Sequence, residues 1–321
     1  MAKTEKYAIG VDLGGTNIKF GIVSQKGKLI KKISLNSKAE GGPEKVIKQI
    51  TLGIKEILSS NKKKIRGIGI GAPGVVSVKK GTVENPPNFS GWTKVNLGKL
   101  ISKEFDIDCY VENDANAAAI GEMIFGAGKR YKSFVMITLG TGVGGGIIIN
   151  RKLYRGEIGS AGEIGHITIN YNGPRCKCGS FGCIEAYVGN NYLISKWQSD
   201  LTAAPNQKIL KLINNDLNLL TPIIIQKAAE EGDKFAKKVI ADMGEQIGSA
   251  LASVSNLLDI STFIIGGGVS GFGKPLFSAI NKSLIDRVIT SLRNRANVLP
   301  AKLKNEAGIK GASALVFYNS Q

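Results

Sequence analysis

Short apolar stretches recur along the chain, and the spacing of their apolar residues predicts strands in some places and helices in others. Residues 7–13 form an apolar run that is typical of a buried strand. Residues 17–23 and 28–35 alternate between apolar and polar positions, with glycines in the turns between them. The beginning of the sequence therefore predicts a β-meander.

Helical spacing begins at Pro43, because proline favours the first turn of a helix. The apolar residues that follow recur on one helical face: Val46, Ile47, Ile50, Ile54, Ile57 and Leu58. Similar patterns predict strands at 65–70 and 108–111, and helices at 95–105 and 113–125. Together these elements predict one α/β domain.

The second half of the sequence repeats this order of elements. Two predicted strands, 133–139 and 145–150, again flank a glycine turn, and a third is expected at 164–170. The remaining expected elements are mainly helix over 184–258, a strand at 262–265, and helices at 274–292 and 309–318. The sequence therefore predicts a two-domain α/β protein with a cleft between duplicated halves.

Glycine changes this picture more than any other part of the composition. It accounts for 41 of the 321 residues, well above its usual share of about 7%. The glycines cluster in short loops after apolar runs, where a backbone without side chains can approach a ligand such as phosphate.

The net charge of +18 favours polyanionic partners. The lysines are nevertheless scattered, with 62–64 as their longest run, so we predict no nucleic-acid partner. No apolar stretch reaches the ~18 residues of a membrane span, and the polar residues 1–6 do not resemble a signal peptide. These features predict a cytoplasmic protein without a membrane partner.

Three segments match the pattern G-x-G-x-x-G, at 69–74, 140–145 and 266–271. The first two precede strand-like residues, and the third lies too near the C-terminus for a dinucleotide domain, so a nicotinamide dehydrogenase is disfavoured. Residues 268–274 imitate a P-loop, but Pro275 stands where a hydroxyl should bind Mg²⁺. A Walker-type NTPase is therefore disfavoured as well.

Two glycine turns at matched positions indicate a different phosphate site. Residues 12–16 (Asp-Leu-Gly-Gly-Thr) and 140–146 (Gly-Thr-Gly-Val-Gly-Gly-Gly) each join two predicted strands. Two ordinary hairpins are the alternative, but matched turns facing across a cleft would clamp the phosphates of a nucleotide. Asp12 is placed to hold Mg²⁺ through water. The predicted phosphate-binding residues are Asp12, Gly14, Gly15, Thr16, Gly140, Thr141 and Gly142.

An acidic motif opens the helix predicted after the strand at 108–111. Residues 112–119 read Glu-Asn-Asp-Ala-Asn-Ala-Ala-Ala, and Asp114 lies near the helix N-terminus, where the helix dipole stabilises a carboxylate. An Asn or Asp at this point also serves as an N-cap. Phosphoryl transfer to a hydroxyl needs a carboxylate that accepts the hydroxyl proton, and the two roles are compatible.

A histidine and three cysteines form a candidate metal site. His166 is the only histidine, and the cysteines Cys176, Cys178 and Cys183 follow within a short loop. This donor set is typical of a closed, tetrahedral zinc site, and disulfides are disfavoured in a reducing compartment. We therefore predict structural Zn²⁺ at these four residues. Cys109 lies alone in a strand and is expected to be buried as a small hydrophobe.

The order of these motifs resembles the ROK kinases (repressor, open reading frame, kinase), from Asp12 to about Ala314. The resemblance implies an actin-like ATPase fold of the hexokinase type, which is ribonuclease H-like. It implies a small domain over 1–117, joined by the C-terminal segment 305–321. The larger domain would span 118–304 and carry the zinc loop.

The resemblance also implies roles for individual residues. Asp114 would be the catalytic base, and Gly267 and Gly268 would contact the adenosine and its α-phosphate. His166 would bind zinc through one ring nitrogen and a sugar hydroxyl through the other, which its metal would keep oriented. The implied sugar-binding residues are Asn113, Asp114, Glu163, His166 and Glu185, with Gly74 and Asn88 in further sugar-side loops. Trp92 is expected to be a packing residue.

The function that the resemblance implies is ATP- and Mg²⁺-dependent phosphorylation of the 6-hydroxyl of glucose. Mannose, fructose, N-acetylmannosamine or N-acetylglucosamine remain alternative substrates, and polyphosphate remains an alternative donor. A sugar-sensing repressor is the second alternative, although the turn at Asp12 leaves no room before it for a helix-turn-helix. The sugar and zinc motifs disfavour a non-catalytic structural protein. The resemblance also suggests a homodimer or homotetramer.

Overall fold

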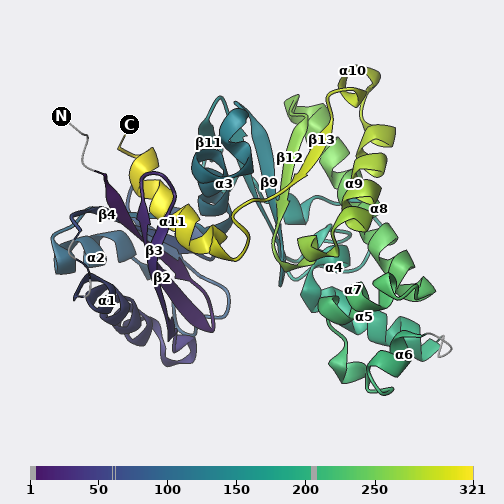
Figure 1. Cartoon of the computed structure of the whole chain (residues 1–321), viewed down its shortest axis with the longest axis horizontal. Helices are drawn as coiled ribbons and strands as arrows, with labels where there is room; N and C mark the ends of the chain where they lie inside the picture. Colours follow the sequence, from purple (N-terminus) through teal and green to yellow (C-terminus); the bar gives the residue numbers. More distant parts are fainter. Residues whose placement is uncertain (1–4, 60, 62, 204–207, 321) are drawn as a thin grey trace. The chain divides into compact units, whose positions relative to one another are not determined.

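The computed structural model of the chain describes residues 5–59, 61, 63–203 and 208–320 (Figure 1). Residues 1–4, at the start of the predicted first domain, and residue 321, at the end of the segment 305–321, lie outside the described residues. The chain divides into two compact units. The first unit comprises Met1–Lys132, Gly146–Gly162 and Ala301–Gln321, and the second comprises Ser133–Gly145 and Glu163–Pro300.

A five-stranded sheet in the order β3-β2-β1-β4-β8 forms the centre of the first unit. Its strands are β1 (Tyr7–Leu13), β2 (Asn17–Ser24), β3 (Leu29–Asn36), β4 (Ile65–Ala72) and β8 (Cys109–Asn113). The first three strands are antiparallel to one another, whereas β4 runs parallel to β1 and β8 runs parallel to β4. The five strands predicted in this part of the chain are confirmed, with ends that differ by at most two residues.

Helices cover both faces of this sheet: α1 (Pro43–Ser59), α2 (Leu97–Phe105), α3 (Asp114–Phe125) and α11 (Ala307–Tyr318). On one face Val11 and Phe20 join the apolar side chains of α1 and α2 in one core. On the other face Gly10 and Gly69 lie against the backbone of α11, where any Cβ atom would overlap it. Glycine at these positions therefore lets α11 pack directly on β1 and β4.

A small second sheet lies between β4 and α2 along the chain, and the sequence patterns predicted only part of it. Its strands are β5 (Val75–Ser77), β6 (Thr82–Glu84) and β7 (Lys94–Val95), in that order. The helix predicted from residue 95 therefore begins later, at Leu97, after the N-cap Asn96. Trp92 is buried, and its indole nitrogen donates to the carbonyl of Val83 at 3.1 Å, which confirms its packing role.

The second five-stranded sheet has the order β11-β10-β9-β12-β13. Its strands are β9 (Phe134–Leu139), β10 (Val143–Ile149), β11 (Lys152–Tyr154), β12 (Thr262–Gly266) and β13 (Asn297–Pro300). As in the first sheet, the last three strands of the order run parallel, and β10 and β11 form an antiparallel hairpin. The repeated strand order confirms the duplication that the sequence predicted.

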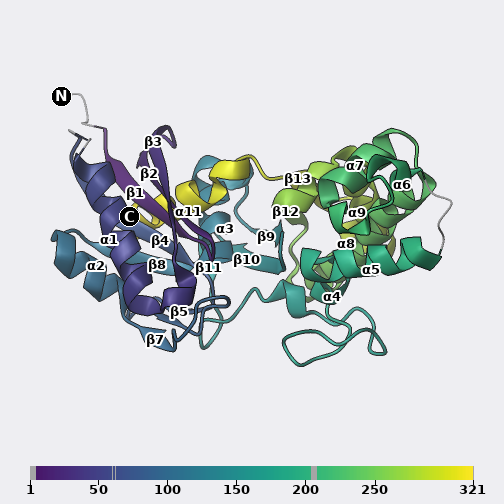
Figure 2. The same cartoon turned by 90° about the horizontal axis from the view of Figure 1, so that it is seen from below.

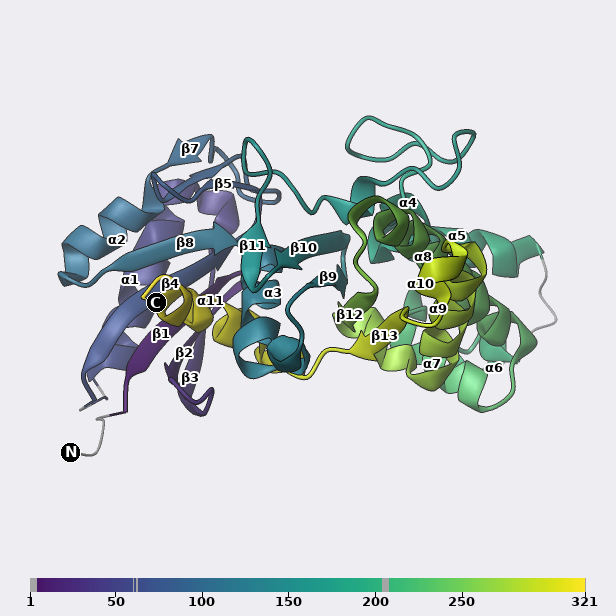
Figure 3. The same cartoon turned by 90° about the horizontal axis from the view of Figure 1, so that it is seen from above.

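The strand predicted at 164–170 is wrong. Ile164–His166 is instead one turn of 3₁₀ helix, and Thr168 forms only an isolated bridge with Cys183. The amide of His166 donates to the carbonyl of Glu163 at 3.0 Å, so the backbone bonds locally rather than to a neighbouring strand. The edge strand of this sheet is β11, and the residues after it form a long loop that leads to α4 (Glu185–Val188; Figure 3).

Most of the second unit after this loop is helical, as predicted (Figure 2). Its longer helices are α5 (Asn190–Ala203), α7 (Pro222–Glu230), α8 (Lys234–Leu258) and α9 (Lys274–Arg287). The short ones are α6 (Ile209–Leu212) and α10 (Thr290–Arg293). The helix predicted over 274–292 ends at Arg287, because Val288 has an extended backbone. Among the described residues, no helix is both long and apolar enough to cross a bilayer.

The described residues also include six short 3₁₀ segments: Ala39–Gly41, Ala127–Arg130, Ile164–His166, Leu217–Leu219, Gly268–Phe272 and Lys304–Glu306.

Candidate functional site

The turn between β1 and β2 places the first group of predicted phosphate-binding residues at one end of the first sheet. The amide of Gly14 donates to the carbonyl of Asn17 at 3.2 Å, and a Cβ atom on Gly14 would lie 2.7 Å from that oxygen. Ser37 supports the turn from β3's side, since its amide donates to the carbonyl of Thr16 at 3.0 Å. Gly15 and Thr16 are exposed at the tip of this turn.

Asp12 lies at the base of the same turn, and its side chain is only 26% exposed. Burial raises the pKa of this carboxyl, and the nearby Lys19, whose ammonium lies 3.7 Å from Oδ2, opposes that shift. Gly308 of α11 packs directly against the carboxylate, where a side chain would overlap it. The Asp12 carboxylate is therefore held in place beside the turn.

The acidic motif forms the end of β8 and the start of α3. Asn113 is the N-cap, and its Oδ1 accepts from the amides of Ala115 at 3.0 Å and Asn116 at 3.2 Å. Asp114 is the first helical residue and is exposed, and its Oδ1 accepts from the amide of Ala115 at 2.8 Å. Asn113 therefore serves as the cap, and the Asp114 carboxylate stands at the surface of the helix N-terminus.

The two loops that were predicted to lie beside the sugar are next to these groups within the first unit. The side-chain amide of Asn113 donates to the carbonyl of Gly74 at 3.2 Å. Gly74 has a φ of +85°, and a Cβ atom there would lie 2.8 Å from the carbonyl of Glu84. A Cβ atom on Gly15 would lie 3.5 Å from that of Asn88. The structure thus brings Gly74 to Asn113, and Asn88 to the β1–β2 turn.

His166 and three cysteines form a compact cluster in the second unit. One donor atom from each of His166, Cys176, Cys178 and Cys183 lies within 4.8 Å of the others. Cys178 and Cys183 have their sulfurs 3.7 Å apart, and the Nδ1 of His166 is 3.7 Å from the sulfur of Cys176. Tetrahedral zinc with Zn–S bonds of about 2.3 Å separates its sulfur ligands by about 3.8 Å, so the cluster fits this ion.

The chemistry of the thiols agrees with a cation at their centre. The pKa of Cys183 is raised to about 12, mainly by burial and to a smaller extent by hydrogen bonding to Cys178 and Cys176. A backbone hydrogen bond from Ser180 lowers the pKa of Cys178 instead. Three crowded sulfurs can all ionise only if a positive charge compensates them, as a zinc ion does.

The two predicted sugar-binding glutamates occupy different positions around this cluster. Glu163 is exposed, and its carboxylate lies 3.9 Å from the Nε2 of His166, on the side of the ring away from Cys176. Glu185 begins α4, and its Oε2 accepts from the amide of Val143 at 2.9 Å. The carboxylate of Glu185 therefore supports the start of β10 as well as bordering the cysteines.

The glycine turn between β9 and β10 rests on the segment that follows Glu185. The amide of Asn190 donates to the carbonyl of Gly140 at 3.1 Å, and that of Asn191 donates to the carbonyl of Thr141 at 3.3 Å. Gly142 lies against the Glu185 carboxylate, where a Cβ atom would overlap it. Thr141 is exposed at the tip of this turn, like Thr16 in the first unit.

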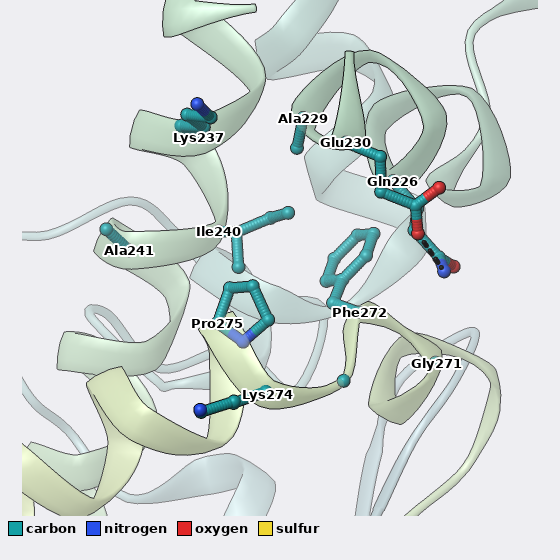
Figure 4. Close-up of a pocket in the computed structure, with 11 residues that line it drawn as sticks. Gln226, Ala229, Glu230, Lys237, Ile240, Ala241, Gly271, Phe272, Lys274 and Pro275 are labelled. Carbon is teal, nitrogen blue, oxygen red and sulfur yellow. Dashed lines mark hydrogen bonds between the residues drawn. The ribbon is translucent and has the colours of Figure 1, made fainter. Parts of the chain in front are cut away.

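A pocket of about 400 Å³ opens beside the third glycine motif, which follows β12 (Figure 4). Gly267 has a φ of +88° and packs on the backbone of Leu139. Phe272, Ile240 and Pro275 supply apolar walls to the pocket, as Figure 4 shows. The polar groups that line it are those of Gln226, Glu230, Lys237 and Lys274. Such a mixture of apolar walls and a few polar groups is typical of small-molecule sites.

Sequence reasoning missed two groups that the structure places here. Arg155 contacts Glu112, and part of the lining of the pocket comes from α7 and α8. An acidic residue inside an apolar strand indicates a buried partner of opposite charge. Glu112 therefore indicated that a basic residue such as Arg155 would lie beside it. Nothing in the local patterns around Arg155 or α7 marked them as functional.

Comparison with known proteins places these residues in a family. The model of the ROK family matches residues 8–318. The chain is 33% identical to the glucokinase of Thermotoga maritima over 308 residues, which cover 96% of each protein. It is also 31% identical to the xylose repressor of Caldicellulosiruptor bescii, over 96% of this chain and 77% of that one.

A solved structure agrees with this assignment. The ROK family glucokinase from Streptomyces griseus, in complex with glucose and AMPPNP, has a TM-score of 0.84 to this chain and is 36% identical. The alignment covers 96% of this chain and 98% of that one. The predicted α/β fold of the actin-like ATPase type is thereby confirmed, as is the resemblance that the motifs indicated. The chain belongs to the ROK family.

Proposed function

We propose that this protein is an ATP-dependent kinase that phosphorylates the 6-hydroxyl of glucose. One observation carries the proposal: an exposed Asp114 carboxylate begins α3, in a chain 36% identical to a glucokinase whose structure contains glucose and AMPPNP. A surface carboxylate next to a fixed amide is the arrangement that proton removal from a bound hydroxyl needs.

In the proposed reaction, Asp114 accepts the proton of the sugar hydroxyl. The hydroxyl oxygen forms a bond to the γ-phosphorus while the bond from that phosphorus to the β,γ-bridging oxygen breaks, and ADP leaves. Asn113 uses Oδ1 for capping and one amide hydrogen for Gly74, so its second amide hydrogen is left to bind a sugar hydroxyl.

The phosphates are proposed to contact the glycine turns at residues 12–16 and 140–146. Gly14, Gly15, Gly140 and Gly142 would offer backbone amides, and the exposed Thr16 and Thr141 would add hydroxyl donors. Mg²⁺, when bound, would neutralise phosphate charge, and Asp12 would hold it through water. Gly267 and Gly268 would contact the adenosine and α-phosphate, and the neighbouring pocket of about 400 Å³ would receive the base.

Structural zinc is proposed for the cluster of His166, Cys176, Cys178 and Cys183. The Nδ1 of His166 faces the sulfur ligands, which leaves Nε2, on the side of Glu163, to donate to a sugar hydroxyl. Glu163 would bind the sugar beside it. Glu185 remains a proposed sugar ligand, and its Oε2 also accepts the amide of Val143.

Gly140→Ala is expected to raise KM for ATP about tenfold without lowering Tm. Apart from Gly140 and its two chain neighbours, no described residue has an atom within 4 Å of a Cβ atom built on Gly140, so there is room for the methyl group. A phosphate group that approaches this backbone closely would collide with the added methyl group. Steady-state kinetics and thermal melting check both effects. An unchanged KM for ATP would mean that the phosphates do not lie at this turn.

The function itself is tested by ADP release from Mg-ATP across a panel of hexoses and N-acetylhexosamines, with a blank that lacks sugar. Release with glucose alone supports the proposal, whereas release only with another sugar replaces the substrate and keeps the reaction. A parallel series with polyphosphate tests the alternative donor.

The second candidate function is a sugar-sensing regulator, favoured by the 31% identity to a xylose repressor. Calorimetric titration with the same sugars separates it from the kinase. Sugar binding without any ADP release, in protein that contains zinc, would support the sensor and contradict the kinase.

We also propose a cytoplasmic location and a homodimeric or homotetrameric state. Four free cysteines among the described residues support a reducing compartment. Light scattering coupled to size-exclusion chromatography measures the assembly directly.

A further inference from the structure

An ion pair between a buried carboxylate and a partly exposed arginine lies next to the start of α3, and the proposed reaction does not use it. Glu112 belongs to β8 and is 2% exposed. Arg155 follows β11, and its Nε and Nη2 donate to the Oε2 of Glu112 at 2.9 Å and 2.7 Å. Two nitrogens of one guanidinium thus donate to the same carboxylate oxygen.

The other oxygen of Glu112 holds the residues around the proposed base. Its Oε1 accepts from the amide of Asn113 at 3.1 Å and from the side-chain amide of Asn116 at 3.2 Å. Asp114 lies between these two attachment points in the sequence, and Asn113 is the first of them. The carboxylate therefore links the end of β8 to the first turn of α3.

Arg155 also begins a loop that it helps to close. Its carbonyl accepts from the amide of Ala161 at 3.1 Å, which ties the two ends of residues 155–161 together. Gly156, with a φ of +70°, makes the turn that this requires. Arg155 thus fixes the base of this loop through its backbone and contacts the Glu112 carboxylate through its side chain.

Because the two side chains carry opposite charges, removal of either one is expected to disturb the residues around the other. A buried carboxylate that loses its only cation keeps a large desolvation cost, so its surroundings shift to find another donor. Here those surroundings are the backbone of Asn113 and the side chain of Asn116. A displacement of about 1 Å at a reacting group can cost about 100-fold in rate.

We infer that Glu112 and Arg155 are positioning residues that orient Asn113 and Asp114 toward the sugar hydroxyl. The inference rests on the proposed kinase function, and it concerns kcat rather than nucleotide binding. The pair acts through the capped end of α3 and touches neither sugar nor ATP.

The test compares Arg155→Met, Glu112→Gln and the double variant in the full-length, zinc-containing protein. We expect Arg155→Met to lower kcat about 100-fold, because it leaves Glu112 charged and unpaired. Glu112→Gln keeps one acceptor for the α3 donors, and we expect a loss of about fivefold. The double variant is expected to recover to about the level of Glu112→Gln, which is a non-additive result.

Arg155→Lys separates positioning from simple stabilisation. Lysine keeps the positive charge but lacks the two fixed N–H groups that meet Oε2. We expect its Tm to lie close to that of the wild type while kcat falls about tenfold. KM for ATP and the zinc content are expected to stay unchanged in all four variants.

Arg287→Met is the matched control. Arg287 pairs with Glu245 in the second unit, with Nη2 and Oε1 also 2.7 Å apart, and it touches none of the proposed site residues. Its kcat is expected to stay within about twofold of the wild type.

The outcomes separate this inference from the proposed function. If the wild type releases ADP with sugar, and Arg155→Met and Arg155→Lys keep full kcat per folded molecule, the pair serves stability alone and the inference fails. If the wild type releases no ADP with any sugar of the panel, the proposed function fails and the inference fails with it.

Discussion

Asp114→Asn is expected to lower kcat for glucose about 1,000-fold, with little change in KM for ATP. The asparagine side chain has nearly the same shape, and its Oδ1 can still accept the amide of Ala115 that Asp114 accepts at 2.8 Å. It cannot take a proton from the sugar hydroxyl at neutral pH, so the loss reports on the base itself. Initial rates of ADP release, measured over a range of glucose concentrations, give both constants.

Asp106→Asn is the control for this change. Asp106 is exposed in the same unit, at the C-cap of α2, and its φ of 52° suits asparagine well. Its kcat is expected to match the wild type. If Asp114→Asn retained a third of the wild-type kcat, Asp114 would not be the base, and the proposed reaction would need another proton acceptor.

Cys178→Ser is expected to abolish zinc binding and to lower Tm by about 5 °C, which corresponds to about 3 kcal/mol for a chain of this size. Cys178 is exposed, so the substitution disturbs little besides the metal site. Without its fourth ligand the zinc is lost, and the loop that leads to α4 loses the ion that holds it together. Metal analysis gives the zinc per chain, and thermal melting gives Tm.

The same variant tests the proposed sugar contacts. Without zinc the His166 ring is no longer held by a metal, so KM for glucose is expected to rise more than KM for ATP. Cys109→Ala is the control, because Cys109 lies in β8, outside the metal cluster. Full zinc loss with an unchanged Tm would contradict a structural role for the ion.

Local patterns predicted most of the sheet strands because their apolar residues are continuous or alternate between two glycine turns. The same reasoning failed in two places in the second sheet and the loop after it. Residues 164–170 alternate like a strand, but local hydrogen bonds at His166 turn the backbone into 3₁₀ helix. The edge strand β11 has only three residues, which is too few for a pattern to appear.

The residues of the candidate site were also predicted only in part from the sequence. Glycine turns, the Asn-Asp pair and the cysteine spacing are local, so the sequence displayed them, and the family resemblance supplied their roles. Contacts between distant residues had no such signal. Arg155 and Glu112 are 43 residues apart, and Glu185 and Val143 are 42 apart. Only the folded chain brings these partners together.

The position of α11 has a consequence for how the protein is made. This helix packs on β1 and β4 through Gly10 and Gly69, yet it follows the whole second unit along the chain. A ribosome therefore completes the second unit before it releases the helix that covers one face of the first sheet. During synthesis that glycine-lined face therefore stays uncovered until the last helix of the chain is made, so the first unit completes its packing only after the second unit has been synthesised.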